Sequence, residues 1–236
     1  MNNQINVICK DFSTKASIVT LFDQSKKISS PPRTVKPSLL SNPEVIQWIN
    51  GDLSFLNKQN EPEGDTFSNG KGISKKKTID QMKILEDLWG QATMKTIRPD
   101  LTLDKQWTNR FGEYLIEEYY LSQGVAITKP PKKNGFQPDW ETDEFIIEVK
   151  TQTYNTTGTA GEKILGTPFK YCEIPELYNK PLKIIVIGGA ERECRGHFGI
   201  IGSTGSATKQ RFIDFYRESG IHFVGLSTIL TKKTVN

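Results

Sequence analysis

Three residues with the chemistry of a metal-dependent hydrolase occur close together in the chain. Pro138-Asp139 is followed, after eight residues, by Glu148-Val149-Lys150 at the end of an apolar segment. Alternate side chains of an extended strand share a face, so Glu148 and Lys150 would point the same way and Val149 would point into the opposite layer. The triplet therefore predicts an acid and a base displayed side by side.

A neighbouring strand over residues 136–140 would bring Asp139 beside Glu148. Two carboxylates and the carbonyl of Val149 supply the oxygen ligands that Mg²⁺ prefers. A metal held there can neutralise charge on a phosphodiester and lower the pKa of an attacking water, while Lys150 stabilises the hydroxide or the phosphorane. We therefore expect Mg²⁺-dependent phosphodiester hydrolysis, with Mn²⁺ able to substitute.

The same residues have a purely structural alternative. A short pattern of this kind also arises by chance. In that case Asp139 ends a turn, and Glu148 and Lys150 lie on the solvated face of an edge strand. Pro99-Asp100 serves as an internal control, because no acid-x-Lys triplet follows it and it falls between two predicted helices. Only the second Pro-Asp pair lies among predicted strands.

The elements that must position these residues alternate between helix and strand. Helical spacing of apolar residues predicts helices over 43–56, 78–96 and 103–122, with Thr78 as a cap and Gly124 as a stop signal. Strands are predicted over 125–128, 136–140 and 144–153, as a sheet edge or meander.

The last third of the chain continues this alternation. We expect a helix over 161–178 that breaks near Gly166 and Pro168, followed by a central strand over 182–187 covered on both faces. The Gly188-Gly189 pair indicates close packing or a tight turn. A helix over 209–219, a strand over 221–224 and a short helix over 226–230 complete the prediction.

In order and motifs, residues Trp107–Leu230 resemble the PD-(D/E)xK nucleases, and within them the type II restriction endonucleases. The shared parts are a helix with Phe111-Gly112-Glu113, then Gln137-Pro138-Asp139, then the Phe145–Lys150 strand, and then a helix leading into the central strand. The resemblance implies an α/β fold with a restriction-endonuclease-like core, in which helices flank a central mixed β-sheet, plus an N-terminal extension.

The resemblance also implies roles for individual residues. Asp139 and Glu148 would be metal ligands, and Lys150 would be the catalytic lysine. Glu113 matches an acidic residue that many members carry on the first core helix, although it could equally be a surface residue.

Candidate DNA-contacting residues lie in three polar segments. Residues 151–163 are rich in hydroxyls, amides and glycine, which hydrogen-bond phosphates and base edges, although an ordinary loop ending in a helix cap has the same composition. Two further segments are basic and turn-rich, and such loops are as often only solvated. The candidates are Asn155, Thr156, Thr157, Thr159, Lys163, Lys132, Lys133, Arg192, Arg195 and Lys209.

Composition indicates a soluble globular protein. The chain has 236 residues, 25% charged and 36% hydrophobic, and its net charge of +4 permits a polyanionic partner without requiring one. Turn formers and charges over 58–77 predict a linker, so we expect an N-terminal arm or subdomain over 1–75 and an endonuclease domain over 76–236. Three distant cysteines and no targeting or membrane segment predict a cytoplasmic location.

The leading hypothesis is a type II site-specific deoxyribonuclease that cuts double-stranded DNA at a short sequence within a restriction-modification system. A homodimer is expected, because a palindromic site matches two-fold protein symmetry. The alternatives are a repair or junction-resolving nuclease that recognises DNA shape, and a non-catalytic DNA-binding module. The two histidines form no HNH, HExxH or Ser-His-Asp pattern, and no GxGxxG or GxxxxGK[ST] motif indicates a nucleotide cofactor.

Overall fold

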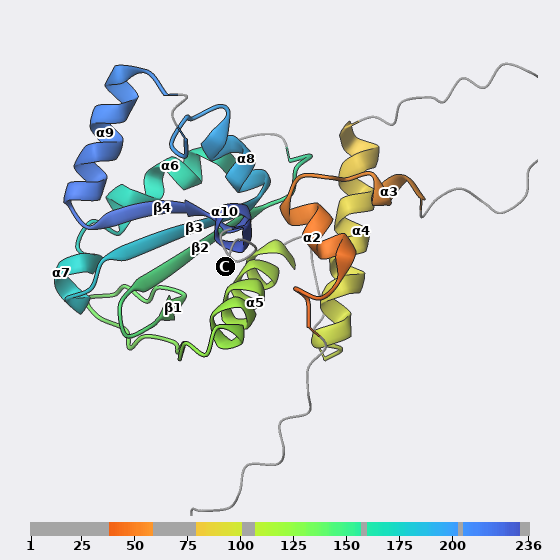
Figure 1. The fold of residues 1–236 in the computed structure, drawn as a ribbon, viewed down its shortest axis with the longest axis horizontal. Helices are drawn as coiled ribbons and strands as arrows, with labels where there is room; N and C mark the ends of the chain where they lie inside the picture. Colours follow the sequence, from red (N-terminus) through yellow and green to blue (C-terminus); the bar gives the residue numbers. More distant parts are fainter. Residues whose placement is uncertain (1–37, 59–78, 101–106, 157–159, 203–204, 232–236) are drawn as a thin grey trace, which may run out of the picture. The chain divides into compact units, whose positions relative to one another are not determined.

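A four-stranded mixed β-sheet forms the centre of the fold (Figure 1). The structure is a computed structural model that describes residues 38–58, 79–100, 107–156, 160–202 and 205–231. The strands lie in the order β1 (Trp140–Glu141), β2 (Ile146–Gln152), β3 (Leu182–Gly188) and β4 (Ile221–Gly225). β1 pairs with β2 in the antiparallel direction, whereas β2, β3 and β4 are mutually parallel. The predicted α/β class with helices around a mixed sheet is confirmed.

Each face of the sheet is covered by its own set of helices. Ile185 and Ile187 of β3 pack with α2 (Pro43–Ile49), α3 (Phe55–Lys58), α4 (Ile79–Ile97), α5 (Trp107–Ser122) and α10 (Leu226–Thr231), and we call this cluster the α5-side core. Ile184 and Val186 pack with α6 (Ala160–Lys170), α7 (Ile174–Tyr178), α8 (Gly189–Arg195) and α9 (Ala207–Glu218), forming the α6-side core. The alternation confirms that β3 is an interior strand buried on both faces.

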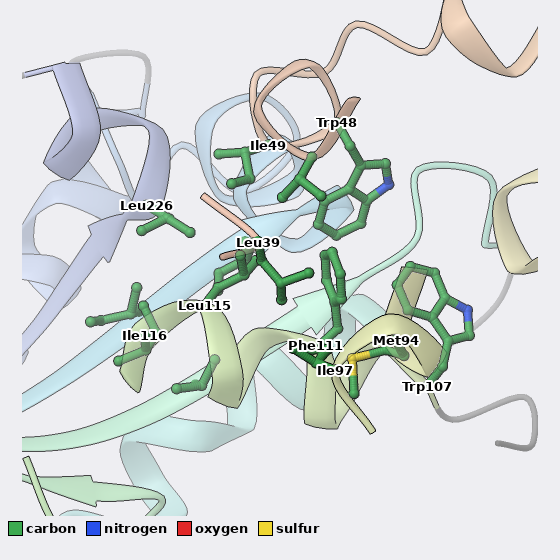
Figure 2. Close-up of a cluster of buried hydrophobic side chains, with 14 of the residues drawn as sticks. Leu39, Trp48, Ile49, Met94, Ile97, Trp107, Phe111, Leu115, Ile116 and Leu226 are labelled. Carbon is green, nitrogen blue, oxygen red and sulfur yellow. The ribbon is translucent and has the colours of Figure 1, made fainter. Parts of the chain in front are cut away.

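The α5-side core is rich in aromatic rings. Trp48, Trp107 and Phe111 are fully or almost fully buried in it and lie close together in Figure 2. The rings of Trp48 and Phe111 make an edge-to-face contact with centroids 5.5 Å apart. Residues 38–57 therefore share a core with α4, α5 and the sheet. The predicted domain boundary near Lys75 lies outside the described residues and stays a prediction.

Most predicted helices are present, with shifted ends. α4 and α5 match their predictions, although Thr78 and residues 103–106 lie outside the described part of the chain. α5 ends at Ser122, and Gly124 follows as the predicted stop with a φ of 72°, while the N–H of Val125 donates to the carbonyl of Tyr120 at 3.0 Å. The predicted helix over 43–56 divides into α2 and α3, because the chain turns after Asn50 at Gly51, whose φ is 82°.

The helix predicted over 161–178 breaks at a different place. α6 continues through Gly166 and Pro168 to Lys170, and α7 begins at Ile174. Pro168 removes the backbone N–H that would bond to the carbonyl of Ile164, but the helix continues past it for two more residues. The helix at 189–195, α8, was not predicted at all.

Of the two arrangements predicted before β2, the sheet edge is confirmed, because β1 is the outermost strand and pairs with β2, whereas the three-stranded meander is wrong. Residues 125–128 form no strand and contribute a single bridge from Thr128 to Glu141. Of the strand predicted over 136–140, only Trp140 belongs to β1. A turn with positive φ at Asn134 and Gly135 interrupts this region, so that its residues make isolated bridges instead of a ladder.

Tight packing at Gly188 and Gly189 is confirmed. A Cβ atom at Gly188 would lie 2.5 Å from the Trp48 ring, and one at Gly189 would lie 2.2 Å from the Thr153 carbonyl oxygen. The chain can therefore leave β3 directly into α8 beneath the loop that follows β2. No helix among the described residues combines the length and the apolar character needed to cross a membrane.

Candidate active site

β2 displays Glu148 and Lys150 on one face, as the alternation predicted. Ile147 and Val149 belong to the α5-side core, whereas Ile146 belongs to the α6-side core, so Glu148 and Lys150 share the α6 side. Glu148 is only 5% exposed, and its Oε1 accepts a hydrogen bond and ion pair from Lys150 Nζ. The acid and the base are thus in direct contact.

Asp139 joins this pair from the residue before β1. β1 and β2 pair Trp140 with Ile147, and continuing that register places Asp139 beside Glu148. The backbone N–H of Val149 donates to Asp139 Oδ2 at 2.7 Å. The N–H and C=O of one strand residue point to the same edge, so the Val149 carbonyl faces the Asp139 side and not β3. The structure therefore brings together Asp139, Glu148, Lys150 and the Val149 carbonyl.

The electrostatics of this cluster disfavour a second bare carboxylate. Burial, and then the charge of Glu148, raise the pKa of Asp139 to about 7, against the opposing effects of the Val149 N–H and Lys150. Burial and then the nearby Glu148 charge also raise the pKa of the Tyr171 hydroxyl. When two carboxyl groups share a buried site, sharing one proton is favourable, whereas carrying two negative charges is unfavourable.

Glu148 also carries an unsatisfied oxygen. Its Oε2 is buried and accepts no well-aligned hydrogen bond from any described residue, although the Tyr171 hydroxyl lies close to the Glu148 carboxylate. Burying such an oxygen costs free energy of folding unless water or a ligand interacts with it. Two carboxylates and a carbonyl are hard oxygen donors, so these residues fit a divalent cation such as Mg²⁺. Among the described residues no three His, Cys, Asp or Glu side chains are placed so that they could hold one metal ion together, so this donor set depends on the carbonyl and on water.

Glu113 enters the same site from α5. A Cβ atom at Gly112 would lie 1.8 Å from the Thr151 hydroxyl oxygen, so the glycine is what lets α5 lie this close to β2. Glu113 Oε2 pairs with Lys129 Nζ at 2.8 Å and lines the same cavity as Asp139. Glu113 is thus near the two acids, but its carboxylate already has a cationic partner.

These residues open onto a cavity of about 810 Å³. β2 and the segment after it form one wall, α5 contributes Glu113, and α6 forms another wall. Four lysines line it together with the three acids. Those lysines are Lys83, Lys150, Lys163 and Lys170. The cavity therefore combines an acidic cluster with a cationic wall, which suits an anionic substrate held against a metal ion.

The polar segment after β2 divides between the cavity and the protein interior. Thr156 lines the cavity and its hydroxyl hydrogen-bonds that of Thr153. Asn155 turns away instead, and its Nδ2 donates to Glu86 Oε2 at 3.1 Å. A direct DNA contact through the Asn155 amide would have to break that bond. Thr157 and Thr159 lie outside the described residues.

The predicted basic residues of the other two segments lie away from the cavity. Lys132 is exposed, whereas Lys133 Nζ donates to the Leu177 carbonyl at 3.0 Å. Arg192 donates to the Tyr154 carbonyl at 2.6 Å.

Arg195 and Lys209 are also engaged within the protein. Arg195 pairs with buried Glu191 at 2.7 Å, and Lys209 donates to the His197 carbonyl at 3.1 Å. Of the predicted basic residues, only Lys163 on α6 lines the cavity. Their DNA-binding role stays a prediction.

Three residues of this region were not foreseen from the sequence. Tyr171 and Lys170, at the end of α6, line the cavity, and Glu86 on α4 is completely buried beneath the segment that follows β2. Each acts across a large sequence separation, so no local spacing signals it. A buried helical position occupied by glutamate, among Met82, Leu85 and Trp89, was the one available hint for Glu86.

Comparison with known proteins adds no relative: no family model, no curated protein and no solved structure matches this chain. The resemblance to restriction endonucleases consequently rests on the sequence motif and stays a prediction.

Proposed function

We propose that this protein is a Mg²⁺-dependent endonuclease of the type II restriction kind, which hydrolyses phosphodiester bonds of double-stranded DNA. The observation that carries the proposal is the convergence of Asp139, Glu148 and Lys150 on one cavity, with a buried Glu148 oxygen that lacks a partner. A homodimer acting at a short palindromic site within a restriction-modification system belongs to the same proposal.

The chain's residues have distinct tasks in this reaction. Asp139, Glu148 and the Val149 carbonyl would hold the cation, which supplies charge neutralisation at the phosphate and a more acidic bound water. Lys150, which contacts Glu148, would lie next to the attacking water and would stabilise the negative charge that develops on the phosphorane. The water oxygen forms a new bond to phosphorus while one ester P–O bond breaks. The products are a phosphate monoester and a hydroxyl.

The direct test is cleavage of a plasmid with Mg²⁺ and with EDTA. Wild-type protein should give discrete fragments with Mg²⁺ or Mn²⁺ and none with EDTA. Asp139→Asn keeps an oxygen that can accept the Val149 N–H, so this variant should stay folded while losing cleavage. Lys150→Gln should likewise remain folded and inactive.

Each other outcome assigns a different function. Preferential cutting of branched or mismatched duplexes would favour a repair or junction-resolving nuclease. Duplex binding that both variants retain, in a wild-type protein that never cuts, would identify a non-catalytic DNA-binding module.

A further inference from the structure

The wall of the cavity formed by α6 has features that metal binding does not explain. Lys163, Gly166, Thr167 and Lys170 all line the cavity and follow helical spacing of three, four and seven residues. They therefore lie along one stripe of the helix, which we call the α6 face. Glu113, Asp139 and Glu148 line the same cavity, so the α6 face and the candidate metal site share one space.

The two lysines of the α6 face differ in pairing from the other two in the cavity. Lys150 pairs with Glu148, and Lys83 pairs with Asp87 at 2.6 Å. Within the described part of the chain, neither Lys163 nor Lys170 forms an ion pair with a carboxylate. Lys170 Nζ donates to the Tyr171 hydroxyl at 3.2 Å, which holds the ammonium without neutralising it. The uncompensated positive charge of the cavity is therefore on α6.

Gly166 separates these lysines and has no packing role in the described protein. A Cβ atom there would meet nothing within 4 Å. Glycine inside a helix is unfavourable relative to alanine, and it is used where a ligand approaches the backbone closely. Here the open space over Gly166 is the cavity itself.

We propose that the α6 face binds the sugar–phosphate backbone of the cleaved strand, with Lys163 and Lys170 on two phosphates and Gly166 where the strand passes closest to the helix. Seven helical residues span about 10.5 Å, so the two ammonium groups are far enough apart to contact two separate phosphates of one strand. The inference rests on the proposed function for its substrate, but not on catalysis.

The test measures binding of a labelled DNA duplex as salt is varied, with every protein carrying Asp139→Asn so that no strand is cut. Each lysine that neutralises a phosphate contributes about 0.9 to the slope of log Kobs against log[salt]. Lys163→Gln and Lys170→Gln should each lower that slope by about 0.9, and each should weaken binding about fivefold at about 150 mM salt. Lys95→Gln is the matched control, since Lys95 is exposed on α4 and does not line the cavity; it should change neither quantity.

Substitutions at Gly166 provide a second test that does not depend on charge. Gly166→Ala adds one methyl group in open space and should leave the protein folded, while Gly166→Gln should block the strand and weaken binding with little change in slope. Thermal melts confirm that each variant is folded. Unchanged affinity and slope in both lysine variants would overturn the inference, even if the wild-type protein cuts DNA.

The remaining outcomes separate this inference from the proposed function. Reduced slopes in both lysine variants, in a protein whose wild type never cuts, would sustain the α6 face and overturn the nuclease. A parent protein that binds no duplex even at low salt would overturn the inference, and together with a wild type that never cuts DNA it would overturn the proposed function as well.

Discussion

Two buried glutamates, Glu86 on α4 and Glu148 on β2, have opposite surroundings. Glu86 is fully buried and receives hydrogen bonds from the Trp48 indole at 2.7 Å, the Tyr154 N–H at 2.9 Å and the Asn155 amide at 3.1 Å. Glu148 is 5% exposed, pairs with Lys150 through one oxygen, and leaves the other oxygen without a partner. Both are buried charges, but only one is satisfied by the protein.

The difference separates a structural carboxylate from a candidate functional one. A buried charge is tolerated when hydrogen bonds or an opposite charge replace its water, and several kcal/mol are at stake when they do not. At Glu86 the protein supplies the donors, and they tie α2 and the segment after β2 to α4. At Glu148 the donors are incomplete and a second acid lies beside it. A cation would complete that site. A buried carboxylate whose hydrogen bonds are incomplete is therefore the observation that marks Glu148 as a candidate functional residue.

The largest expected effect is on cleavage by the Glu148→Gln variant. Loss of one charged metal ligand should lower the cleavage rate about 10³-fold, which corresponds to about 4 kcal/mol of transition-state stabilisation. In EDTA its free energy of unfolding should change by less than about 1 kcal/mol, because losing the ion pair with Lys150 is offset by relief of repulsion with Asp139. Rate assays and urea melts on the same preparation measure both. A folded variant that cuts at the wild-type rate would remove Glu148 from the site.

Glu86→Ala should show the reverse pattern. The variant leaves the Trp48 and Tyr154 N–H groups buried without acceptors, so we expect a loss of about 3 kcal/mol in the free energy of unfolding. Glu86→Gln retains one carbonyl acceptor and should lose less. Urea denaturation of both variants gives the comparison, and a loss below about 1 kcal/mol for Glu86→Ala would show that Glu86 is not a structural link.

Mg²⁺ should stabilise the wild-type protein but not the Asp139→Asn variant. A ligand at a hundredfold excess over its Kd adds about 2.7 kcal/mol to the free energy of unfolding when it binds only the folded state. Glu86→Gln should keep this gain, because Glu86 does not line the cavity. Thermal melts with Mg²⁺ and with EDTA provide the measurement. Equal gains in wild type and Asp139→Asn would place the cation elsewhere.

The parts of the site that the sequence predicted are those that neighbours along the chain determine. Alternation along β2 alone puts Glu148 and Lys150 on one face, and the apolar run of β3 alone marks an interior strand. The three-residue and four-residue spacing of α4 and α5 is equally local. These predictions needed no knowledge of distant contacts.

The sequence predictions that were wrong or incomplete concern regions whose structure depends on turns or on contacts with distant residues. Residues 125–139 have strand-forming side chains, but the turn at Asn134-Gly135 leaves this region with isolated bridges. The side-chain amide of Asn155 could hydrogen-bond a base edge. In the structure it donates instead to Glu86, which is distant in the sequence. Lys170 and Tyr171 reach the cavity only because α6 continues past Pro168. Neither composition nor local spacing predicts contacts of this kind.

The smallest expected effect is at the other Pro-Asp pair. Asp100 follows Pro99 in the turn after α4, where its side chain is 62% exposed and pairs with Arg98 at 2.6 Å, whereas Asp139 is held in the cavity by the Val149 N–H. Exposed ion pairs contribute little, so Asp100→Asn should shift Tm by less than about 2 °C and leave the cleavage rate unchanged. The same substitution at Asp139 should abolish cleavage. If Asp100→Asn impaired cleavage as severely as Asp139→Asn, position beside Glu148 would not be what gives an aspartate its function in this chain.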